Sequence, residues 1–116
     1  MKVLIADDHP LMVDGLCNLL EAHGIDVVGT VGDGQAAVAE ALRLEPDLVL
    51  MDIRMPVCDG LCATRLIKAQ RPEMKSLILT TSAEDEDLFE AIKSGACGYL
   101  LKITSGTAFI EALHGL

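Results

Sequence analysis

The sequence has 116 residues, of which 51% are hydrophobic and only 3% aromatic, and its formal net charge is −9. This length fits one domain with an aliphatic core, and the scarcity of aromatic residues disfavours a surface on which ligands stack. The negative charge argues against direct binding to nucleic acid or to an anionic membrane, since both require a positive field. It fits a bound cation or a basic protein partner, or it serves only solubility.

The chain begins with an apolar segment at residues 3–6, which predicts a strand. Four apolar residues are too few for a signal peptide or a membrane span, so we expect a cytoplasmic protein. A helix is predicted next, because apolar residues such as Leu16 and Leu20 recur at helical spacing and Gly24 is a stop signal. Either of the acids that precede Pro10 could cap this helix.

The second strand is predicted at residues 27–31. The glycine-rich stretch 29–34 lacks the glycine order of a dinucleotide-binding loop, so we interpret it as a turn. Asp33 can cap the helix that follows. That helix is expected to end at Glu45, because the residue before a proline, here Pro46, avoids the helical region.

The second half of the chain continues the alternation. Strands are predicted at residues 48–51, 77–80 and 97–101, and helices are predicted to begin near Asp59, after Ser82 and near Thr104. Arg71, which precedes a proline, and Gly95 should end the first two of these helices. Strands that alternate with helices indicate an α/β fold, in which a parallel sheet carries helices on both faces.

Ligands bind such sheets outside the carboxyl ends of the strands. The residues at these places are Asp7, Asp8, Asp52, Thr80 and Lys102. For any one of them alone, a solvated loop position is the simpler explanation. Together they are harder to dismiss, because three carboxylates at one edge repel one another and need a cation or a proton.

These side chains have complementary chemistry. Carboxylate oxygens are the ligands that Mg²⁺ prefers, a lysine binds phosphate oxygens, and a threonine hydroxyl can donate to the same group. A nucleophilic carboxylate, a metal ion and a lysine are what the formation of an aspartyl phosphate requires. The sequence therefore predicts a phosphoryl-accepting site at one edge of the sheet.

Five segments resemble the receiver domains of bacterial two-component response regulators. They are residues 4–10 (LIADDHP), 47–56 (DLVLMDIRMP), 59–60 (DG), 79–82 (LTTS) and 98–102 (GYLLK). Each is weak alone, but together they are specific and they cover nearly the whole chain. The resemblance implies a doubly wound, flavodoxin-like sheet of five parallel strands in the order 2-1-3-4-5.

The resemblance also implies a role for each matching position. Asp52 matches the phosphorylated aspartate, Asp8 the direct metal ligand, and Asp7 an acid that often acts through water. The backbone carbonyl of Arg54 should complete the metal set. The implied cation is Mg²⁺, with Mn²⁺ as an alternative.

Three further matches concern switching. Lys102 matches the lysine that contacts the phosphoryl group, Thr80 the switch hydroxyl and Tyr99 the switch aromatic. Phosphorylation would draw in Thr80 and turn Tyr99 inward, which would change the face formed by the fourth helix, the fifth strand and the fifth helix. Ile103 stands where many receivers have proline, and because family members often keep this bond cis, we predict a cis peptide before Ile103.

Residues 8–10 and 98–102 resemble the NarL/LuxR subfamily, whose outputs bind DNA. We expect residues 1–116 to form the receiver domain and a C-terminal DNA-binding domain to follow outside this sequence. The implied partners are a sensor histidine kinase and the chain's own output domain, and a homodimer on phosphorylation is left open. The implied activity is a self-limiting switch, with no turnover of a free substrate.

Three other functions deserve comparison. A haloacid-dehalogenase-like phosphatase also uses an aspartate nucleophile, magnesium and a lysine, but its second acid is missing here, since Asp52 is followed by Ile53 and Arg54. A receiver-shaped interaction module that is never phosphorylated is disfavoured by the joint presence of the site residues. A flavodoxin-type nucleotide binder would require a phosphate loop and more aromatic residues.

Local roles are assigned to His9 and to the four cysteines. No partner His or Cys lies near His9, so we expect a structural contact. Cys17, Cys58, Cys62 and Cys97 contain no CxxC pair and no complete zinc set. We therefore expect reduced, mostly buried thiols.

Overall fold

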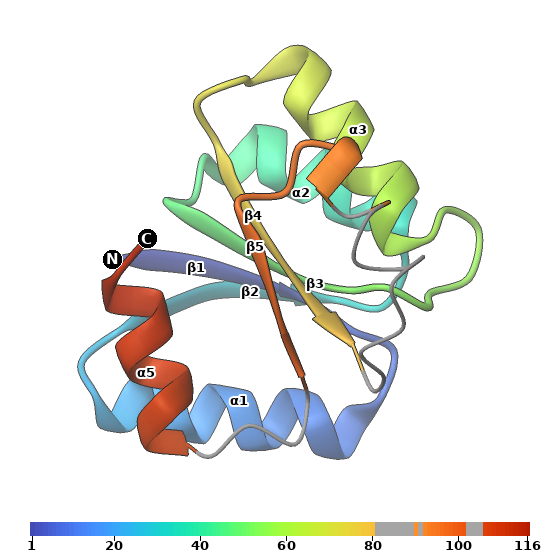
Figure 1. The fold of residues 1–116 in the computed structure, drawn as a ribbon. Helices are drawn as coiled ribbons and strands as arrows, with labels where there is room; N and C mark the ends of the chain where they lie inside the picture. The colour runs from blue at the N-terminus through green and yellow to red at the C-terminus, as the bar shows by residue number, and fades with distance from the viewer. Residues whose placement is uncertain (81–89, 91, 102–105) are drawn as a thin grey trace.

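The computed structural model describes the chain except for residues 81–89, 91 and 102–105. Figure 1 shows strands that alternate with helices in the described part of the chain. The elements are β1 (Lys2–Ala6), α1 (Pro10–Ala22), β2 (Asp26–Val31), α2 (Gly34–Leu44), β3 (Leu48–Asp52), α3 (Gly60–Gln70), β4 (Lys75–Thr80), β5 (Gly98–Leu101) and α5 (Gly106–His114). Most of the helix predicted after Ser82 lies outside the described residues, although its predicted end at Gly95 has a positive φ of 97°.

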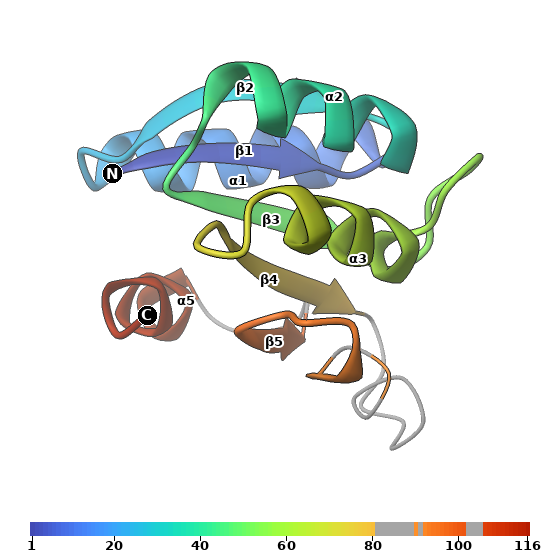
Figure 2. The same cartoon turned by 90° about the horizontal axis from the view of Figure 1, so that it is seen from above.

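The five strands form one parallel sheet in the order β2-β1-β3-β4-β5. Helices α2 and α3 cover one face of this sheet, and α1 and α5 cover the other (Figures 1 and 2). The predicted α/β class, the doubly wound arrangement and the strand order 2-1-3-4-5 are therefore confirmed. Such a sheet presents the carboxyl ends of its strands at one edge, as the site prediction requires.

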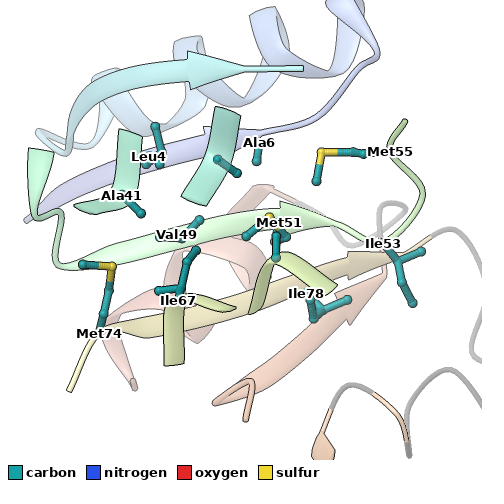
Figure 3. Close-up of a cluster of buried hydrophobic side chains, with 12 residues drawn as sticks. Leu4, Ala6, Ala41, Val49, Met51, Ile53, Met55, Ile67, Met74 and Ile78 are labelled. Carbon is teal, nitrogen blue, oxygen red and sulfur yellow. The ribbon is translucent and has the colours of Figure 1, made fainter. Parts of the chain in front are cut away.

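Two apolar clusters hold the helices on the sheet. On the α2–α3 face, Val49 and Met51 of β3 pack with Ala41 and Ile67 of the helices (Figure 3). On the other face, Leu50 packs in a cluster that contains residues of α1 and α5, namely Leu16, Leu20, Phe109, Ile110 and Leu113. All five residues of β3 are buried, so the central strand, which ends at Asp52, is held rigidly from both sides.

Local signals set the helix ends largely as predicted. The side chain of Asp33 accepts a hydrogen bond from the amide of Ala36 at 2.7 Å and caps α2. The side chain of Asp59 caps α3 in the same way. Gly24 follows α1 with φ 73°, and Glu45, which precedes a proline, ends α2 in the left-handed conformation with φ 49°.

Two predictions are corrected. The cap position of α1 is taken by His9, which makes no side-chain cap hydrogen bond, so Asp7 and Asp8 do not cap this helix. The thiols are less buried than expected, because Cys97 is exposed and the other three are half-buried. Cys58 and Cys17 pack against the outside of the two apolar clusters, which cover only part of each thiol. Among the described helices, none has the length and apolarity needed to span a bilayer.

Candidate functional site

Two neighbouring strands of the sheet, β1 and β3, bring acidic residues to the same edge. Asp7 directly follows β1, and Asp52 is the last residue of β3. The amide of Asp7 donates to the carbonyl of Val31 at 2.9 Å, and the amide of Ile53 donates to the carbonyl of Leu79 at 3.1 Å. The sheet hydrogen bonding thus continues past the strand ends and fixes the backbone that carries both carboxylates.

Ligand atoms of Asp7, Asp8, His9 and Asp52 all lie within 4.8 Å of one another. The side chains of Asp7 and Asp52 are 0% and 4% exposed, whereas that of Asp8 is 38% exposed. The predicted convergence of the three carboxylates is therefore observed. The partly exposed Asp8 lies on the solvent side of the two buried acids.

The imidazole of His9 points into this cluster. Its Nδ1 lies 2.8 Å from Oδ1 of Asp7, 3.2 Å from Oδ1 of Asp8 and 3.5 Å from Oδ2 of Asp52. The backbone amide of His9 also donates to Oδ1 of Asp7 at 2.9 Å. The expected structural contact of His9 is present. Its proximity to all three carboxylates was not predicted, because the sequence interpretation rested on the lack of a second His or Cys ligand near His9. Its position directly after two acids was the available signal.

The electrostatics of the cluster favour a cation. At a separation of 4.8 Å, two unit negative charges repel each other by about 3.5 kcal/mol at an effective dielectric constant of about 20. A divalent ion would offset this repulsion for all three acids at once. Carboxylate oxygens are hard ligands that suit Mg²⁺ or Mn²⁺, so the chemistry of the donor set fits the expected metal.

A glycine allows α3 to approach the backbone of Asp52 closely. The amide of Gly60 donates to the carbonyl of Ile53 at 3.0 Å. A Cβ atom at Gly60 would collide with the carbonyl oxygen of Asp52, and one at Gly34 would collide with the carbonyl oxygen of Cys58. The N-termini of α2 and α3 therefore hold the loop that follows β3, a contact that the sequence did not predict because Gly60 was interpreted only as a helix start.

The remaining predicted residues lie further along the same edge or outside the described chain. Thr80 is buried and ends β4, where it pairs with Leu101 of β5. Tyr99 lies within β5 and is 39% exposed. Arg54 is exposed in the loop after β3. Lys102 lies outside the described residues, so its contact with the site and the cis peptide that follows it stay predictions.

Residues 3–114 match the family profile described as the response regulator receiver domain. The chain belongs to this family. Its fold agrees, because the signal receiver domain of the NarL response regulator from Mycobacterium tuberculosis superposes with a TM-score of 0.94 at 31% identity, covering 98% of this chain and 93% of that one. A LuxR-family response regulator from Aurantimonas superposes with a TM-score of 0.93 at 29% identity, over 98% of this chain and 82% of that one.

Two bacterial regulatory proteins are similar in sequence. The transcriptional regulatory protein LnrK of Bacillus subtilis is 43% identical over 97% of this receiver domain and 52% of its own length. The response regulator VraR of Staphylococcus aureus is 40% identical over 98% of this chain and 55% of its own length. The chain thus spans about half the length of these relatives, and its predicted resemblance to LuxR- and NarL-type receivers is confirmed.

Proposed function

We propose that this receiver domain is the phosphoacceptor switch of a two-component response regulator, in which Asp52 takes a phosphoryl group from the phosphohistidine of a sensor histidine kinase. One observation carries the proposal. The carboxylate of Asp52 is almost completely buried, yet it lies within 4.8 Å of ligand atoms of Asp7 and Asp8 at the carboxyl edge of the sheet. This is the place where sheets of this class bind ligands.

Asp7, Asp8 and Asp52, together with the backbone carbonyl of Arg54, would hold the cation. We assign Mg²⁺, with Mn²⁺ as the alternative, because the carboxylates supply hard oxygen ligands. When bound, the ion neutralises negative charge on the transferring phosphoryl group.

The chain's own residues account for the transfer. A carboxylate oxygen of Asp52 attacks phosphorus in line with the phosphohistidine nitrogen. A P–O bond forms, the P–N bond breaks, and the histidine nitrogen keeps the electron pair and takes up a proton. The ammonium group of Lys102 would contact the phosphoryl oxygens and stabilise their charge. Later attack by water on phosphorus would restore the carboxylate of Asp52 and release phosphate, which makes the switch self-limiting.

The output of the switch would pass through β4 and β5. Thr80 is buried at the end of β4, next to β3, and this position supports a role for its hydroxyl in sensing a group on Asp52. Tyr99 is 39% exposed on β5, so an inward turn of its ring would bury surface that now faces solvent. Movement of both side chains would bias an equilibrium between two shapes of the surface that includes β5 and α5.

The partners follow from this role. They are a sensor histidine kinase and a C-terminal DNA-binding domain of the whole protein, since LnrK is a transcriptional regulator about twice as long as this chain. Dimer formation on phosphorylation is one way in which the changed surface would act. We assign the protein to the cytoplasm, where a DNA-binding output would work.

The test is an intact-mass measurement after incubation with Mg²⁺ and acetyl phosphate. We expect one phosphoryl adduct on the wild type and on the control Asp14→Asn, whose carboxylate is exposed on α1. The adduct should be absent from Asp52→Asn. Equal adduct on Asp52→Asn, or steady hydrolysis of phosphate esters by the wild type, would contradict the proposal, and the latter would favour a phosphatase.

A further inference from the structure

The imidazole of His9 is arranged like a ligand of the carboxylate cluster. In an octahedral site with metal–ligand distances of about 2.1 Å, adjacent ligand atoms lie about 3.0 Å apart and opposite ones about 4.2 Å apart. Nδ1 of His9 lies 2.8, 3.2 and 3.5 Å from the carboxylate oxygens of Asp7, Asp8 and Asp52. The nitrogen therefore stands at near-adjacent spacing from all three oxygens, as one more corner of the same polyhedron would.

The backbone of His9 is fixed beside the acidic residues. The backbone amide of His9 donates to Oδ1 of Asp7 at 2.9 Å, which fixes the residue between β1 and α1. Pro10 begins the helix directly afterwards and restricts the backbone further. Without an ion, the 2.8 Å hydrogen bond to Oδ1 of Asp7 requires a proton on Nδ1. A bound ion would replace that proton, and because the side chain is 61% exposed, Nε2 could then carry the ring proton and bond to water.

An imidazole nitrogen changes which cation a carboxylate site prefers. Mg²⁺ takes oxygen ligands and keeps several waters, whereas Mn²⁺ accepts an imidazole beside carboxylates and Ni²⁺ binds imidazole much more tightly. We propose that His9 is a nitrogen ligand of this site. The receiver then binds Mn²⁺ and Ni²⁺ through three carboxylates and one imidazole, and it binds Mg²⁺ through the carboxylates alone. This inference rests on the proposed function, because it concerns the same metal site.

The first test measures affinity by calorimetry, using protein without a purification tag. The Ni²⁺ titrations are made in a Cys58→Ser, Cys62→Ser background, so that these two neighbouring thiols do not bind the ion. We expect His9→Ala to lower Ni²⁺ affinity by about 10-fold or more and to leave Mg²⁺ affinity equal or higher. His23→Ala is the matched control, because His23 is exposed at the far end of α1 and its ring contacts the carbonyl of Leu19 at 2.9 Å.

The second test detects the bond itself. Pulsed electron spin resonance of the wild type with bound Mn²⁺ should show modulation from a coordinated nitrogen. That signal should change when histidine is labelled with ¹⁵N, persist in His23→Ala and vanish in His9→Ala. This measurement on the wild type stands even if a variant folds poorly.

The outcomes separate this inference from the proposed function. Equal Ni²⁺ affinity in wild type and His9→Ala, or an Mn²⁺ signal without nitrogen modulation, would overturn the role of His9. If Mg²⁺ and acetyl phosphate still gave the phosphoryl adduct on Asp52 in the same samples, the proposed function would survive. If the wild type formed no adduct, the proposed function would fail whatever the nitrogen signal showed.

Discussion

The buried carboxylate of Asp52 should lower the stability of the protein when no metal ion is bound. Its side chain is 4% exposed and lies within 4.8 Å of ligand atoms of Asp7 and Asp8. Each of these two repulsions amounts to about 3.5 kcal/mol at an effective dielectric constant of about 20. Solvent around Asp8, which is 38% exposed, screens the repulsion between Asp8 and Asp52. Replacing Asp52 with Asn keeps the volume of the side chain and removes its charge.

We therefore expect Asp52→Asn to raise the free energy of unfolding in metal-free buffer by about 1–4 kcal/mol, roughly the size of one partly screened repulsion. For a chain of this size, each kcal/mol raises Tm by roughly 3–5 °C. Thermal unfolding followed by circular dichroism, in EDTA at low salt and pH 8, measures this. The comparison is repeated in a His9→Ala background, because a protonated imidazole beside the three carboxylates would offset their charge.

Metal binding supplies the matching control. Mg²⁺ at 100 times its Kd should stabilise the wild type by about 2.7 kcal/mol and Asp52→Asn by less, so the difference in Tm should shrink. Asp14→Asn removes one exposed charge from α1 and should shift Tm little under either condition. If Asp52→Asn melted at or below the wild type in EDTA, the electrostatic account of the cluster would be refuted.

Three further predictions follow from local contacts. Gly60→Ala should lower the free energy of unfolding by about 1–3 kcal/mol, because the added Cβ overpacks the end of β3. Gly15→Ala is the control, since Gly15 has open space around it, and it should not lower this free energy. Urea unfolding compares the two variants, and equal effects would contradict the contact of Gly60. Asp33→Ala should lower the free energy of unfolding by about 1 kcal/mol, because it removes the cap of α2, and Asp33→Ser should restore most of that loss. If Asp33→Ala left the free energy of unfolding unchanged in the same assay, the capping role would be refuted. Burial and the neighbouring Cys62 thiol raise the pKa of Cys58 to about 12, so its thiolate forms only at high pH. Alkylation of Cys58, followed by peptide mass spectrometry, should still accelerate at pH 10, and a plateau near pH 9 would show an ordinary thiol.

The general layout of the site could be predicted because it depends on topology. Continuous apolar segments such as residues 48–51 identify buried parallel strands, and parallel strands bring their carboxyl ends to one edge. That rule alone placed Asp7 and Asp52 together, although they are 45 positions apart in the sequence. The order of the strands needed the family resemblance, since periodicity does not determine which strands are neighbours.

The details that could not be predicted depend on backbone geometry over a few residues. The capping interpretation of Asp7 and Asp8 was wrong because the sheet hydrogen bonding continues to Asp7 and leaves His9 at the cap position. The same short connection turns the His9 ring toward the acids. The need for glycine at position 60 arises from the approach of α3 to the Asp52 carbonyl, a tertiary contact that leaves no periodic signal in the sequence.

The most direct test of the account is to locate the modified residue chemically. Borohydride reduces an aspartyl phosphate to homoserine, so the phosphorylated chain can be reduced, digested and sequenced by tandem mass spectrometry. We predict homoserine at position 52 in the wild type after treatment with Mg²⁺ and acetyl phosphate, and none when Mg²⁺ is removed. Homoserine at another aspartate, or at none in a folded wild-type chain, would contradict the claim that Asp52 is the phosphoacceptor.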